Sequence, residues 1–133
     1  MKPVEVIRQL QKASEGLRYV SETDYPFTVL HWQDQVLADL SLQSLLRLTG
    51  HAPDLPVTME TLETFFAIAA QPQDWHDEEG QEVVRRYQAL LRVLQVFLQD
   101  VRVYRVGRVT IEVYILGQIA NDIAGLATRI VET

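Results

Sequence analysis

The sequence contains no cysteine, which excludes disulfide scaffolds, zinc sites built on thiolates, thiol catalysis and thiol redox switching. No apolar run approaches the ~18–20 residues that cross a bilayer. The first residues also lack the basic and apolar regions of a secretory signal. The six glycines are scattered and form no phosphate-binding run. These absences predict a cytoplasmic protein without a membrane segment.

Basic residues are in the minority, with 12 Lys and Arg against 18 Asp and Glu, so the formal net charge is −6. Binding to nucleic acid requires clustered Lys and Arg, and we therefore do not expect nucleic acid as a ligand. The excess of negative charge is compatible with a basic protein partner. At 133 residues, 47% of them hydrophobic, the chain is expected to fold as one domain spanning residues 1–133.

Apolar residues at helical spacing predict four helices. They are expected over residues 3–16, with Pro3 in the first turn, over 36–48, after a cap at Thr58 or Thr61, and over about 77–99. The third of these has an apolar face formed by Leu62, Phe65, Phe66 and Ile68 or Ala69.

Strand-like patterns occupy the remainder. Residues 27–32 are almost continuously apolar, which is typical of a central strand. From Val101 the apolar period becomes two, Gly107 is the expected hairpin turn, and residues 124–131 are expected to return antiparallel. Helices followed by a terminal β-meander predict the α+β class, with helices on both faces of a largely antiparallel sheet.

No catalytic pattern is present. None of the three histidines, His31, His51 and His76, is spaced with a serine or carboxylate as in a known nucleophile motif. His76 and Glu79 have a spacing that a metal ion could share, but an acidic helix start exposed to water is the more ordinary interpretation. We predict that the protein is not an enzyme and has no cofactor of its own.

Two acidic segments are candidate binding surfaces. Five carboxylates and no Lys or Arg lie between Asp74 and Glu82, and Trp75 among them suits an interface anchor. The alternatives are a helix start exposed to water and a Trp75 side chain folded onto the core. Glu22 and Asp24 form a second acidic turn, for which a solvated loop is the alternative.

The end of the sequence is a third candidate. Glu132 and Thr133 follow the last predicted strand with almost no tail, so their carboxylates and hydroxyl are expected close to the folded body. Oxygen atoms of this kind suit Mg²⁺, Mn²⁺ and arginine.

The sequence resembles the nuclease A inhibitor family in ordered blocks that cover most of its length. The matching blocks are Leu10–Leu17, Ser21–Phe27, Thr49–His51, Pro72–Trp75, Val103–Gly107, Val113–Gly117 and Leu126–Thr133. Residues 33–46 match poorly, and His76 stands where an aromatic residue is expected.

The resemblance implies a single-domain, three-layer α/β/α sandwich that inhibits a sugar-non-specific bacterial endonuclease of the ββα-metal type in a 1:1 complex. It implies that Thr133 reaches the nuclease's catalytic Mg²⁺ or Mn²⁺, so that the metal bridges the complex but does not bind the free inhibitor. It also implies that Glu22 engages the nuclease's arginines and that Asp74 and Trp75 add a contact. All four residues are present.

Two other hypotheses remain open. Residues 33–46 and His76 are compatible with a binding or immunity module of the same fold that has a different protein partner. The spacing of His76, Glu78 and Glu79 is compatible with a metal-dependent hydrolase.

Overall fold

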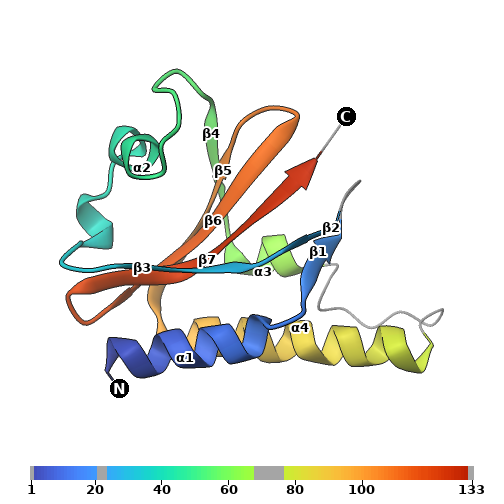
Figure 1. The fold of residues 1–133 in the computed structure, drawn as a ribbon. Helices are drawn as coiled ribbons and strands as arrows, with labels where there is room; N and C mark the ends of the chain where they lie inside the picture. The colour runs from blue at the N-terminus through green and yellow to red at the C-terminus, as the bar shows by residue number, and fades with distance from the viewer. Residues whose placement is uncertain (1, 21–23, 68–76, 132–133) are drawn as a thin grey trace.

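The computed structural model describes residues 2–20, 24–67 and 77–131 (Figure 1). The helices are α1 (Pro3–Ser14), the 3₁₀ helix η1 (Leu37–Asp39), α2 (Leu42–Leu48), α3 (Leu62–Phe66) and α4 (Glu78–Phe97). The strands are β1 (Arg18–Val20), β2 (Asp24–Pro26), β3 (Thr28–Trp32), β4 (Val57–Glu60), β5 (Gln99–Val106), β6 (Thr110–Ile119) and β7 (Asp122–Val131).

Five of these strands form one antiparallel sheet in the order β3-β7-β6-β5-β4. The run β5-β6-β7 confirms the predicted C-terminal meander. Gly107 ends β5 with a φ of 115°, and its amide donates a hydrogen bond to the carbonyl of Pro56. Strands β1 and β2 form a separate two-stranded ribbon.

Helices together with an antiparallel sheet confirm the α+β class. In Figure 1, α1 and α4 lie below the sheet and α2 lies above it. Buried side chains of α1, α3 and α4 share one hydrophobic cluster with alternate residues of β5, β6 and β7. The intervening residues of these strands form a second cluster with side chains of η1 and α2. The central strands are therefore buried on both sides.

The two long helices have the pattern that the sequence predicts. Asp77 caps α4 by accepting a hydrogen bond from the amide of Gly80 at 2.7 Å. The first turn is acidic, as the helix dipole favours. One face of α4 buries Val84, Tyr87, Leu90 and Leu94, and α1 likewise buries Val6, Leu10 and Ser14.

The single helix predicted over residues 36–48 is wrong, because the segment is divided into η1 and α2. Leu40 is extended between them. Ser41 then starts α2, since its side chain accepts a hydrogen bond from the amide of Ser44 at 3.0 Å. Serine is favoured at the N-cap position, so Ser41 begins a new helix within the leucine-rich segment that would otherwise favour one longer helix.

The prediction that residues 27–32 form a central strand is also wrong, because β3 lies at one edge of the sheet. Its apolar content has another cause. Val29 packs on the first cluster, whereas Leu30 and Trp32 pack on the second, so both faces of this edge strand are covered.

The opposite edge contains a strand that the sequence analysis does not predict. Thr58 lies in β4, and Thr61 is the residue that caps α3, by accepting a hydrogen bond from the amide of Thr64 at 3.1 Å. The predicted positions of Ile68 and Ala69 lie outside the described residues. Among the helices that the structure describes, none is long and apolar enough to span a membrane.

Candidate functional site

All five residues predicted to bind a partner, Glu22, Asp74, Trp75, Glu132 and Thr133, lie outside the described residues, as does His76. The structure does describe the helices and strands that adjoin these residues in the sequence. Glu22 belongs to the three residues that connect β1 to β2, and Glu132 and Thr133 follow β7. Asp74 and Trp75 lie between α3 and α4.

The ribbon of β1 and β2 lies beside the C-terminal half of β7 (Figure 1). A buried side chain on β7 makes the connection. The hydroxyl of Thr128 lies 3.1 Å from the carbonyl oxygen of Pro26 and 3.4 Å from that of Tyr25, with the hydroxyl as donor. Thr128 is only 5% exposed, so this hydroxyl has little access to water and depends on these acceptors.

The next residue of β7 also contacts the ribbon. The guanidinium carbon of Arg129 lies 5.2 Å from the centroid of the Tyr25 ring, a cation–π distance. Its Nε donates a hydrogen bond of 2.6 Å to the carboxylate of Glu112, its cross-strand neighbour on β6. Tyr25 first, and then Glu112, raise the pKa of the Arg129 guanidinium, so this cation has partners on both the ribbon and β6.

Aromatic residues connect the base of the ribbon to α3 and α4. The ring of Phe27, just after β2, lies 6.5 Å from Phe66 and 6.3 Å from Tyr87, centroid to centroid. The hydroxyl of Tyr87 donates to the carbonyl of Arg18 at the start of β1. The base of the ribbon, α3 and α4 therefore share one aromatic cluster.

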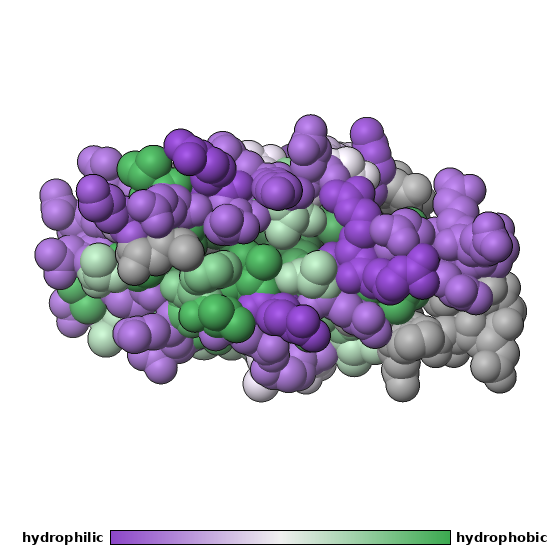
Figure 2. All heavy atoms as spheres, turned by 90° about the horizontal axis from the view of Figure 1, so that it is seen from below, coloured by the Kyte–Doolittle hydropathy of each residue, from purple (hydrophilic) through white to green (hydrophobic). Residues whose placement is uncertain are grey.

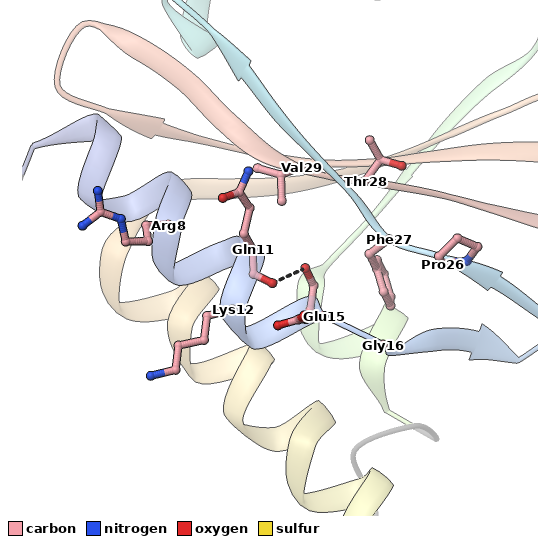
Figure 3. Close-up of a pocket in the computed structure, with 10 residues that line it drawn as sticks. Arg8, Gln11, Lys12, Glu15, Gly16, Pro26, Phe27, Thr28 and Val29 are labelled. Atoms are coloured by element: carbon pink, nitrogen blue, oxygen red, sulfur yellow. Dashed lines mark hydrogen bonds between the residues drawn. The ribbon is translucent and has the colours of Figure 1, made fainter.

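A groove of about 660 Å³ lies between α1 and the β2–β3 segment. Figure 3 shows residues that line it. Gln11 extends toward Val29, whereas Arg8 and Lys12 point away from the strand. The dashed line is the 3.5 Å hydrogen bond that the Ser14 hydroxyl donates to the Gln11 carbonyl. The described lining contains Arg8, Lys12 and Glu15, but the two basic side chains point away from the strand. The hydroxyl of Ser14 is bound to the carbonyl of Leu10 at 2.7 Å, so these groups do not form a catalytic arrangement in the groove.

The two described histidines have structural hydrogen bonds. Nε2 of His31 lies 2.7 Å from the carboxylate of Asp122. Nε2 of His51 lies 2.7 Å from the hydroxyl of Tyr114, whose pKa is raised by burial. Within the described ranges, no three His, Asp or Glu residues are grouped to hold a metal ion. Sequence spacing does not reveal these pairs, which join residues 91 and 63 positions apart.

Figure 2 shows the face of the molecule that carries α1 and α4. Apolar side chains gather at its centre and hydrophilic ones surround them. Val4 of α1 is 63% exposed and Val96 of α4 is 67% exposed.

Comparison with known protein families gives one match that extends over nearly the whole chain. The profile of the nuclease A inhibitor-like protein family matches residues 4–133. A comparison with curated proteins found no match. The family match includes β1–β2, β7 and the segments in which the five predicted binding residues occur. The chain therefore belongs to the nuclease A inhibitor-like protein family.

Proposed function

We propose that this protein is a single-domain inhibitor of a sugar-non-specific endonuclease of the ββα-metal type, which it blocks in a 1:1 complex. The observation that carries the proposal is the family match over residues 4–133, since membership of an inhibitor family supports an inhibitory role. The net charge of −6 agrees, because a nuclease site that binds phosphates is basic.

In this proposal the acidic groups imitate nucleic-acid phosphates. The oxygen atoms of Thr133 reach the nuclease's divalent metal, and Glu132 adds negative charge next to it. Glu22 pairs with the arginines of the nuclease. Asp74 adds a polar contact, and Trp75 supplies apolar area that loses water on binding.

The metal belongs to the nuclease. The free inhibitor has no metal or cofactor of its own, and Mg²⁺ or Mn²⁺ joins the two proteins only in the complex. We also propose that the inhibitor acts in the cytoplasm, where it protects the DNA and RNA of a bacterial host, and that it binds neither nucleic acid nor membranes.

The test is inhibition of a ββα-metal nuclease in Mg²⁺ or Mn²⁺ by three forms of the protein: the unmodified chain, the chain without Thr133, and the chain with one residue added after Thr133. We expect stoichiometric inhibition by the first form. We expect the other two to have inhibition constants raised by about a hundredfold, a loss of about 2.7 kcal/mol, because the terminal oxygens no longer reach the metal.

Lys2→Ala is the matched control, since it changes the other end of the chain and should leave the inhibition constant unchanged. Equal inhibition constants for the unmodified chain and the two chains changed at Thr133 would contradict the metal bridge. Full nuclease activity at excess unmodified protein would contradict the inhibitor function for that nuclease. In that case we would favour the alternative of a different protein partner, because residues 33–46 match the pattern of the family poorly. These residues contain η1 and part of α2.

A further inference from the structure

The ribbon of β1 and β2 lacks the support that a sheet gives its strands. It contains two strands of three residues each, and an isolated two-stranded hairpin is at best marginally stable in water. Its register is nevertheless regular, with Arg18 opposite Pro26 and Val20 opposite Asp24. Contacts outside the ribbon must therefore hold it in place.

Such contacts are made between Tyr25 of the ribbon and the sheet, and we name the four side chains involved the hairpin clamp: Tyr25, Glu112, Thr128 and Arg129. Thr128 and Arg129 are successive residues of one strand, so their side chains point to opposite faces of the sheet. The hydrophobic clusters confirm the alternation, because Ile130 belongs to the first and Ala127 to the second. Thr128 bonds the backbone of β2 from one face, and Arg129 contacts the ring of Tyr25 on the other.

Glu112 completes the clamp by fixing the guanidinium. The Arg129 side chain is 43% exposed and that of Glu112 is 23% exposed, so an ion pair there has little value for overall stability. Its geometry has another consequence. The 2.6 Å hydrogen bond to Glu112 directs the guanidinium along the sheet, where it meets the Tyr25 ring. The same bond neutralises a cation that stands four residues before Thr133 in the sequence, which suits the negative charge that the proposed function requires at this end of the chain.

From these contacts we infer that the hairpin clamp holds β2 in a fixed position against β7 before the nuclease binds, and these are the strands that adjoin the Glu22 loop and Thr133 in the sequence. The clamp residues are positioning residues, which act on the nuclease only through these two segments. The inference rests on the proposed function. Preorganisation of this kind increases affinity because the complex does not have to order the hairpin when it forms.

The variants Arg129→Gln and Thr128→Val test the clamp from its two sides. Gln removes the cation, and Val removes the donating hydroxyl at nearly constant volume. The matched control is Arg105→Gln, because Arg105 also pairs with a cross-sheet glutamate, Glu60, but lies on β5, away from the ribbon. Native-state hydrogen exchange of the free protein gives a first measurement. We expect the amides of β1 and β2 to exchange about tenfold faster in both clamp variants, with β6 unchanged. If the amides of β1 and β2 exchange at the wild-type rate in both clamp variants, the inference is overturned.

The second measurement is a double-mutant cycle on the inhibition constant for Arg129→Gln and Glu22→Ala. We expect each single change to raise the constant about tenfold, and the double change to raise it by much less than the product, because the clamp acts through the loop of Glu22. A double effect equal to the product, or an Arg129→Gln effect no larger than that of Arg105→Gln, would overturn the inference. If the unmodified protein does not inhibit, the proposed function itself fails. If it inhibits but the cycle is additive, only the clamp inference fails.

Discussion

At the scale of single residues, Gly125 is the position where the sheet leaves least room. It lies in β7 between Leu30 of β3 and Leu116 of β6. A Cβ atom there would lie 1.7 Å from the carbonyl oxygen of Ile115. That oxygen belongs to the backbone of a central strand and cannot rotate away. We therefore expect Gly125→Ala to lower the free energy of unfolding by about 3 kcal/mol, which urea denaturation measures.

Gly50 provides the control for this substitution. It ends the turn after α2 with a φ of 76°, and no atom lies within 4 Å of a Cβ built there. We expect Gly50→Ala to lower the free energy of unfolding by only about 1 kcal/mol, which is the cost of placing alanine in a left-handed backbone conformation. Equal destabilisation by the two variants would mean that the close approach at Gly125 has no energetic effect.

At the scale of elements, the start of β7 is joined to the end of β3 by Asp122. Its carboxylate accepts hydrogen bonds from Nε2 of His31 at 2.7 Å and from the amide of Asp34 at 3.0 Å. Asp34 adopts a φ of 57°, which few residues other than glycine, asparagine and aspartate tolerate. These hydrogen bonds, that of His31 first, lower the pKa of Asp122 below its ordinary value of 3.8.

The pKa of Asp122 predicts a dependence of stability on pH. Because the pKa is lower in the folded protein than in the unfolded chain, the contribution of this carboxylate is fully present above pH 3.8 and is lost as the pH falls through the folded value. We expect Asp122→Asn to unfold at a lower urea concentration than the wild type at pH 7, with the difference shrinking below pH 4. A constant difference between pH 7 and pH 3 would contradict the role of the ionised carboxylate.

The elements that the sequence predicts are those with a strong local pattern. Helices α1 and α4 have regular apolar stripes, and the meander has a period of two that Gly107 interrupts. The edge strand β4 has only four residues, and Met59 is 53% exposed, so it lacks the apolar run that indicates a strand. The edge position of β3 is not predictable from its own residues, because a strand covered on both faces has the composition of a central one.

The candidate site also joins residues that no local pattern connects. Tyr25 and Arg129 are more than one hundred positions apart in the sequence. They meet because β3 pairs with β7 from Thr28 and Ala127 onward, and β2, which precedes β3, lies beside the following residues of β7. The resemblance in the sequence identifies the family, which the family match confirms. The four binding residues that it implies, Glu22, Asp74, Trp75 and Thr133, stay predictions, as does Glu132.

At the scale of the whole molecule, the net charge of −6 has a consequence for the rate of association. If the partner is a basic nuclease, long-range attraction steers the two proteins together, and added salt screens this attraction beyond about 10 Å at 0.1 M. We expect the association rate constant to fall at least tenfold between 20 mM and 500 mM salt, while the dissociation rate constant changes much less. Stopped-flow mixing of the two proteins measures both rate constants.

A Trp75→Ala variant separates this steering from the contacts made in the complex. Trp75 carries no charge, so its removal should leave the slope of the association rate against salt unchanged while dissociation accelerates about thirtyfold, which corresponds to a loss of ~2 kcal/mol at an aromatic anchor. Glu22→Ala should instead reduce the slope, because it removes one of the charges that the partner attracts. An association rate that does not depend on salt would contradict phosphate imitation by this acidic surface, even if the protein inhibits the nuclease.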